Sequence, residues 1–323
     1  MLLWLALFFV IGAAGTWLAR GYAVRRELLD HPGERRSHAV ATPRGGGMAI
    51  VLALLVAASA LAARHPLQVP LLVAFVLGLL LVAGVGLIDD HRPLSPWSRL
   101  VVHVLAAAVL AIGVAAAFGS LWVAAVAFIA ALVLTNVWNF MDGINGLAAS
   151  QAAIVAAGFA WLAGGVWGWL ALALAAACLG FLPFNFPRAR IFLGDVGSGA
   201  LGYSLAALLA VVLGSQQRWW LPILLVPVSA FLVDAGLTLL RRLWRGERWW
   251  TAHTQHAYQV WARQAGSHAW PTAAYSAWTL CGVLAMGLLR SAPGSFILAS
   301  SIAWYTSGAF LWWWLQRREL GRR

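Results

Sequence analysis

Long apolar runs alternate with short polar segments along the whole chain. A bilayer core of about 30 Å needs roughly twenty apolar residues per helix, and backbone amides that face lipid must be hydrogen bonded within the helix. The pattern therefore predicts an all-α, polytopic membrane protein with about eleven transmembrane helices. The expected spans are residues 1–19, 47–63, 70–88, 100–118, 121–138, 146–163, 165–183, 198–214, 219–240, 272–289 and 294–315.

Arginine residues set the predicted orientation, because all 22 basic residues are arginine. With the first loop inside, only Arg64, Arg218 and Arg290 fall outside. By the positive-inside rule, this bias predicts a periplasmic N-terminus and a cytoplasmic C-terminus. The acidic residues also fall on the inner side, and only Asp234 lies within a span. The inner loops are approximately 20–46, 89–99, 139–145, 184–197 and 241–271.

Composition supports one membrane domain over residues 1–323. The chain is 62% hydrophobic and 10% charged, far from the average of soluble proteins, and no polar linker divides it. Its net charge of +12 does not indicate nucleic-acid binding, because the arginines flank apolar spans. Residues 1–19 lack a basic leading segment, so we expect a retained span rather than a signal peptide. Cys178 and Cys281 lie in apolar runs and are expected to pack there.

The first inner loop ends in Arg44 and three glycines, Gly45 to Gly47. Glycines can leave backbone N–H groups free to converge on an anion, and the next helix would begin there with its positive dipole end. A phosphate site is one interpretation. A flexible joint in a positively charged inner loop is the other, and this segment alone does not separate them.

Three further segments place acids and amides at predicted span ends. Asp89 and Asp90 are adjacent, so a cation or proton between them would relieve their repulsion, and Arg99 follows. Another segment contains Asn136, Asn139, Asp142 and Asn145 together with two glycines, and polar groups there are costly unless they bind something. The third brackets Asp195 with glycines immediately before a helix, which suits a phosphate, a hard cation or a simple helix cap.

Spacing relates these segments to one another. Asp89, Asp142 and Asp195 are separated by equal intervals, each containing two predicted crossings. An even number of crossings returns the chain to the same side, so the three acids can converge on one site. The last inner loop adds Arg248, and it adds His253 and His256, which could share a helical face. No third nitrogen or sulfur ligand for zinc accompanies them, so anion recognition is favoured over zinc binding.

Taken in order, the segments DHPGERRSHAVATPRGGG, DDHRPLSPWSR, NVWNFMDGINGL and IFLGDVGSGALG, with the arginine–histidine loop, resemble the polyprenyl-phosphate N-acetylhexosamine-1-phosphate transferases. That family includes enzymes that start O-antigen and teichoic-acid glycans, and the phospho-N-acetylmuramoyl-pentapeptide transferase. The resemblance covers residues 30–268. It implies transfer of a sugar-1-phosphate from a UDP-sugar to undecaprenyl phosphate at the inner face of the bacterial plasma membrane, with release of UMP.

The resemblance also implies residue roles. Asp195 and Asn139 match magnesium ligands, with manganese as an alternative ion, and Asn145 matches the uracil contact. Asp89 and Asp90 match the acidic pair that activates or positions the lipid phosphate. The remaining candidates for substrate binding are Asp142, Asn136, Arg99, Gly46, Arg44, Arg36, His38, His253, His256 and Arg248. The expected partners are a UDP-amino sugar, undecaprenyl phosphate and the bilayer, and both monomer and homodimer stay open.

The chain departs from the family pattern at three points. Arg36 and Arg99 stand where lysine is usual, and the planar guanidinium changes how a phosphate would be held. The last loop reads AHTQHAYQ rather than a doubled histidine, which is closer to enzymes that start O-antigen with deoxy-aminosugars. Direct in-line attack is favoured over a covalent aspartyl intermediate, but both stay open. The alternatives in other classes are a transporter or flippase of lipid-linked glycans, and a scaffold protein anchored by its tryptophans.

Overall fold

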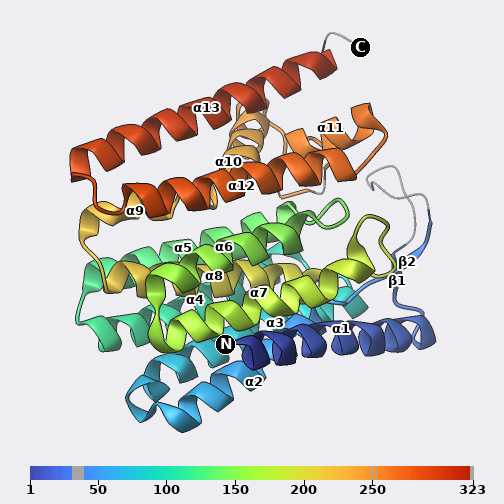
Figure 1. The fold of residues 1–323 in the computed structure, drawn as a ribbon. Coiled ribbons are helices and arrows are strands. Elements are labelled where there is room, and N and C mark those ends of the chain that lie inside the picture. Colours follow the sequence, from blue (N-terminus) through green and yellow to red (C-terminus); the bar gives the residue numbers. More distant parts are fainter. Residues whose placement is uncertain (31–39, 249, 252, 321–323) are drawn as a thin grey trace.

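The computed structural model describes residues 1–30, 40–248, 250–251 and 253–320, and helices dominate this part of the chain (Figure 1). The helices are α1 (Leu2–Arg25), α2 (Met48–Arg64), α3 (Val69–His91), α4 (Pro96–Phe118), α5 (Leu121–Phe140), α6 (Leu147–Ala163), α7 (Gly165–Asn185), α8 (Asp195–Gly214), α9 (Leu221–Leu224), α10 (Ser229–Trp244), α11 (Ala257–Ala265), α12 (Ala269–Leu289) and α13 (Gly294–Leu320). Two short 3-10 turns, η1 (Pro66–Gln68) and η2 (Arg218–Trp220), and one antiparallel pair, β1 (Leu29–Asp30) with β2 (Thr42–Pro43), complete the described fold. The predicted all-α membrane class is confirmed.

Each expected span coincides with helical structure, but the number of crossings stays a prediction. Seven helices of the described chain are long and apolar enough to cross a membrane, or eight if one bent pair counts as a single span. Helices α2 and α6 are apolar but have only 17 residues each. Several helices extend past the expected ends, so that Asp89 and Asp90 belong to α3, Asn139 to α5 and Asp195 to α8.

The prediction of one continuous span over 219–240 is wrong. The chain there bends by 80° between Arg218–Leu224 and Ser229–Trp244. Pro227 lies in the break, and a proline removes a backbone donor and collides with the preceding helical turn. The second part, α10, therefore leaves the direction of the first and packs against α13 and α12 (Figure 1).

Helix α8 is the centre of the bundle. All of its side chains from Val196 to Leu213 are buried, and it packs mainly against α5, α3 and α6. Small residues permit this close packing, because a Cβ at Gly202 would collide with the backbone of Leu134 in α5. The position of α8 matters for function, because its first residue is Asp195.

Glycines also bring three helix ends together where α8 begins. A Cβ at Gly47, before α2, would strike the backbone of Gly197, and a Cβ at Gly86 of α3 would strike the backbone of Asp195. The start of α8 is therefore in backbone contact with both neighbours, and these contacts fix the position of α8 along its own axis relative to α2 and α3.

We expect Gly86→Ala to destabilise the protein by about 1–3 kcal/mol, because the added methyl group must displace the backbone at Asp195. Gly84→Ala is the matched control, since nothing lies within 4 Å of a Cβ at that position of the same helix. Thermal melting of both variants in detergent measures the difference. Equal melting temperatures for the two variants would contradict the close contact.

Candidate active site

A polar cleft of about 320 Å³ lies where α3, α4, α5 and α8 come together. The loop after α5 and the segment before α11 complete its walls. Seven of the residues expected from the sequence to have functional roles line it: Arg99, Asn136, Asn139, Asp142, Asp195, His253 and His256. The sequence intervals therefore do return these segments to one place.

Arg99 connects the acids of α3 and α8. Its Nη1 lies 2.8 Å from Oδ2 of Asp89 and 3.0 Å from Oδ2 of Asp195. The other oxygen of Asp195 accepts a hydrogen bond from the Asn139 amide at 2.6 Å, and the same amide donates to Ser198. Asp89 also accepts from the backbone N–H of Leu94 at 2.5 Å. One guanidinium thus lies between two carboxylates and offsets part of their mutual repulsion.

Asp90 caps helix α8. Its two carboxylate oxygens accept hydrogen bonds from the backbone N–H groups of Asp195, at 3.0 Å, and Val196, at 3.1 Å. A carboxylate at a helix N-terminus satisfies orphan donors and interacts favourably with the helix dipole. The side chain is only 3% exposed, and Nε of Arg44 lies 4.0 Å away. This contact is structural, and a chemical role for Asp90 stays a prediction.

Gly194 makes room for this cap. Its φ of +78° lies in the left-handed region that favours glycine. A Cβ there would also lie 2.6 Å from Oδ2 of Asp90. The glycine before Asp195 is therefore required both by backbone conformation and by space.

Asp142 is half-buried on the cleft wall, and no hydrogen bond from a described residue stabilises its charge. Burial raises the pKa of this carboxyl well above its ordinary value, and the negative charges of Asp195 and Asp90 raise the pKa further. Deprotonated Asp142 is thus costly for the fold without a cation or a donor from a ligand.

Two cleft histidines come from the segment before α11. The expectation that His253 and His256 share a helical face is wrong, because both precede α11 and His256 is its N-cap residue. Their rings are nevertheless 4.8 Å apart. Burial lowers the pKa of His253 to about 4, and charge on His256 and Arg242 adds to that lowering. His253 is therefore neutral near pH 7.

The glycine loop does not present its amides as expected. The N–H of Gly46 donates to the carbonyl of Phe192 at 2.9 Å, and that of Gly47 donates to Leu193 at 2.8 Å. The interpretation of freely converging amides is wrong for these two, because they hold the loop against the chain before α8. Arg44 lies beside Asp90. Arg36 and His38 lie outside the described residues.

Two other candidates lie away from the cleft. The Asn145 amide donates to the Pro187 carbonyl at 3.0 Å, and its backbone carbonyl accepts from Thr272. Arg248 is exposed, and its carbonyl accepts from buried Arg242 at 2.8 Å. Neither lines the cleft.

The sequence analysis missed several cleft residues. His103 lies one turn after Arg99 on α4, and this spacing on an apolar helix was a usable signal. Its Nδ1 is buried without a hydrogen-bond partner in the described residues, and the Asn136 amide, also on the cleft, donates to the Leu132 carbonyl at 2.7 Å. Trp97 and Trp250 lie 6.1 Å apart between ring centroids on the cleft wall, and no sequence spacing connects them.

A magnesium ion that keeps some ligands from water or substrate would draw on the carboxylates of Asp89 and Asp195, which lie on either side of Arg99, because magnesium prefers oxygen. The Asn139 amide turns its N–H towards Asp195, so its oxygen would face such an ion only after the amide rotates. No group of three His, Cys, Asp or Glu side chains in the described chain is arranged to hold a metal. A magnesium ion at this position would therefore depend on the Asn139 amide and on non-protein ligands.

Asp90→Ala should destabilise the protein by about 2 kcal/mol, because two buried amides at the start of α8 lose their acceptors. Asp90→Asn should cost less, since its one carbonyl oxygen still accepts a hydrogen bond. Melting of the detergent-solubilised variants measures both effects. A wild-type melting temperature for Asp90→Ala would show that the cap contributes nothing.

Asp142→Asn should stabilise the protein at about pH 7.5 and have little effect near pH 4. The raised pKa means that the wild type loses stability as the pH rises from the ordinary value of 3.8 towards the higher folded value. The amide cannot ionise, so it avoids this loss. Melting curves across that pH range test the sign, and a variant that is less stable at the higher pH contradicts it.

Comparison with known proteins agrees with this architecture. Residues 72–213 match the model of glycosyl transferase family 4. The chain is 31% identical over 312 residues to a decaprenyl-phosphate N-acetylglucosaminephosphotransferase of Mycobacterium leprae, covering 82% of this chain and 78% of the relative. It is 30% identical over 247 residues to a probable undecaprenyl-phosphate N-acetylglucosaminyl 1-phosphate transferase of Bacillus subtilis, covering 71% and 68%. A phospho-N-acetylmuramoyl-pentapeptide-transferase of Moorella thermoacetica is 35% identical over 206 residues, covering 54% and 63%. The chain is a multi-pass membrane protein that belongs to glycosyl transferase family 4.

Proposed function

We propose that the protein transfers a sugar-1-phosphate from a UDP-amino sugar to undecaprenyl phosphate and releases UMP. The observation that carries the proposal is the polar cluster at the cleft, in which Arg99 joins Asp89 to Asp195 and the Asn139 amide donates to Asp195. The names of the relatives, which are phosphotransferases that act on polyprenyl phosphates, support the same reaction class.

The chemistry begins with the repulsion between two phosphates. The acceptor phosphate has a second pKa near 6, so it is already largely dianionic at neutral pH and needs no strong base. A site for this reaction must instead neutralise charge and align the attacking oxygen with the leaving UMP. Arg99 supplies a fixed positive charge at the cleft, and its planar fork suits phosphate oxygens.

A magnesium ion held by Asp195 and Asn139, with Asp89 adjacent, would neutralise the donor diphosphate and stabilise the leaving group. Asp89 is the residue we assign to positioning the acceptor phosphate, because its partner Asp90 is occupied as the α8 cap. This arrangement favours direct displacement over a covalent aspartyl intermediate, since Asp89 is itself paired with Arg99.

The donor and the pathway are the finer part of the proposal. An N-acetylhexosamine or a related deoxy-aminosugar fits the resemblance of the last loop, and initiation of O-antigen or another envelope polysaccharide follows from it. The arginine distribution supports a cleft that faces the cytoplasm of a bacterial inner membrane, where UDP-sugars are made. A transporter is less well supported. Asp234 is the one acid expected within a span, and both of its carboxylate oxygens accept hydrogen bonds from backbone amides of α11.

The direct test is a membrane assay with radiolabelled UDP-N-acetylhexosamines, undecaprenyl phosphate and Mg²⁺. Wild type should form a lipid-linked product and UMP in equal amounts, and chelation of the metal should stop both. Asp195→Ala should lower turnover by at least about 100-fold while the protein still inserts, because it removes a carboxylate from the reacting diphosphate.

Gly84→Ala is the control, since nothing lies within 4 Å of a Cβ at that position and Gly84 itself does not line the cleft. Absence of lipid-linked product with every donor offered would refute the proposed reaction. Lipid-glycan translocation by proteoliposomes without release of UMP would favour the transporter instead.

A further inference from the structure

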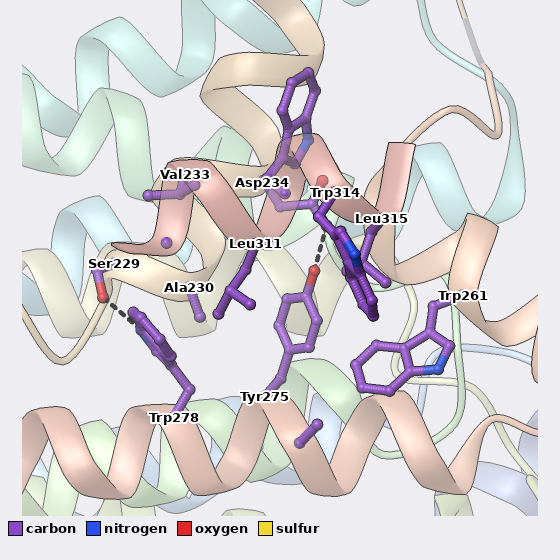
Figure 2. Close-up of a pocket in the computed structure, with 13 residues that line it drawn as sticks. Ser229, Ala230, Val233, Asp234, Trp261, Tyr275, Trp278, Leu311, Trp314 and Leu315 are labelled. Atoms are coloured by element: carbon purple, nitrogen blue, oxygen red, sulfur yellow. Dashed lines mark hydrogen bonds between the residues drawn. The ribbon is translucent and has the colours of Figure 1, made fainter. Parts of the chain in front are cut away.

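Asp234 is a buried carboxylate of α10 whose partners differ from those expected. The sequence suggested pairing with a nearby inner arginine or a place at the lipid-phosphate entrance. In the structure its Oδ1 accepts from the backbone N–H of Ala257 at 2.8 Å, and its Oδ2 accepts from that of Tyr258 at 3.0 Å. The hydroxyl of Tyr275 in α12 donates to Oδ2 at 2.7 Å (Figure 2). The side chain thus holds the first turn of α11 against α10 and α12.

The same carboxylate faces a histidine of the cleft. Nδ1 of His256 lies 3.6 Å from Oδ1 of Asp234, and both side chains are nearly inaccessible to solvent, at 5% and 2%. The ring of His256 also stacks on Phe140, with centroids 6.4 Å apart. His256 lines the cleft, whereas Asp234 does not. Asp234 is thus the charged group beside Nδ1, and the His256 side chain also takes part in the capping box with Gln259 at the start of α11.

A second connection runs from α11 to the Asp142 loop. The Tyr258 hydroxyl donates to the carbonyl of Phe140 at 3.0 Å. A Cβ at Gly143 would collide with that hydroxyl, so tyrosine and loop are in close contact. Asp234 holds the backbone of Tyr258, and therefore supports two walls of the cleft at once.

Behind Asp234 lies an apolar cavity of about 200 Å³, lined largely by aromatic and aliphatic side chains such as Trp261, Trp278 and Leu311 (Figure 2). These side chains surround the carboxylate with apolar groups on the side away from the cleft. Hydrogen bonds and charge interactions are stronger in such surroundings than in water. Within the described residues this carboxylate is bound by backbone amides, a tyrosine hydroxyl and a cleft histidine, which connects it to the cleft.

We propose that Asp234 is a positioning residue for the phosphate transfer, which holds the ring of His256 at the cleft wall, where the ring can contact a substrate phosphate. The inference rests on the proposed function, and it assigns to His256 the phosphate contact. Asp234 itself touches neither substrate nor metal. The bend at Pro227 is what directs α10, and with it Asp234, towards the start of α11.

The test is a double-mutant cycle of Asp234→Asn and His256→Gln, assayed for transfer with the donor on which wild type is active. Each single variant should lower kcat by about 10- to 100-fold, with a change in KM for the donor of less than about 3-fold. The loss in the double variant should be smaller than the product of the two single losses, because Asp234 acts in part through His256. Losses that multiply in the double variant, or full activity in Asp234→Asn, overturn the inference.

Tyr275→Phe is the matched control. It removes one hydrogen bond to Asp234 but leaves the contacts to His256 and to the α11 amides. It should lower the melting temperature while kcat stays within about 3-fold of wild type. A loss of kcat in Tyr275→Phe equal to that of Asp234→Asn would mean that packing, rather than orientation of His256, sets the activity.

A measurement on the unaltered protein keeps the inference testable if Asp234→Asn does not fold. With ¹⁵N-histidine labelling, the nuclear magnetic resonance signal missing from His256→Gln identifies His256 in wild type. We expect this signal to shift when the UDP-sugar donor is added, and a signal that the donor leaves unchanged overturns the inference. Wild type that makes no lipid-linked product defeats the proposed function, whereas active wild type with multiplying losses defeats this inference alone.

Discussion

The capping of α8 by Asp90 is the interaction on which the rest of the site depends. Helix α8 is buried along its length, so its first amides cannot turn to water for hydrogen bonds. A carboxylate from α3 supplies both acceptors and so joins the ends of two central helices. Because Asp195 is the first residue of that helix, the same contact determines where its side chain lies relative to Asp89. The positions of the cleft carboxylates thus follow from the need to cap the N-terminus of α8.

Charge balance in the cleft follows from that placement. Asp89 and Asp195 lie close enough to share Arg99, whereas Asp142 has no such neighbour among the described residues. The described bundle therefore contains an acidic pair that shares one cation, and an acid, Asp142, whose ionisation is costly. An excess of buried carboxylates lowers the stability of the fold. It also favours the binding of cations, and of anionic ligands that bring a cation with them. Ionised Asp142 lowers the stability of the fold while it offers a charge to a ligand, whereas Asp90 stabilises the start of α8.

Much of this could be predicted from the sequence, and the failures have physical causes. Apolar run length gave nearly every helix. The equal spacing of Asp89, Asp142 and Asp195 predicted that they converge, and the structure does bring Asp142 and Asp195 to one cleft, with Asp89 joined to Asp195 through Arg99. The bend at Pro227 was missed because hydropathy ignores backbone geometry. The amides of Gly46 and Gly47 were read as free because nothing local reveals their acceptors, Phe192 and Leu193, far along the chain. The contact of Asp234 with α11 was hidden for the same reason, since three separate helices create it.

The order of elements along the chain has a consequence for biogenesis. The acidic cluster of Asp89, Asn139 and Asp195 is complete once α8 has emerged, because every contact within it comes from earlier sequence. The part of the cleft formed by His253 and His256 is completed later. Asp234 can accept hydrogen bonds from the α11 amides and from the Tyr275 hydroxyl only after those later segments have been synthesised. During synthesis, when earlier parts of a chain fold first, the ribosome-bound protein passes through a stage with its acids assembled and its histidines still untethered. The last helices to be inserted therefore complete the cleft that the first ones began.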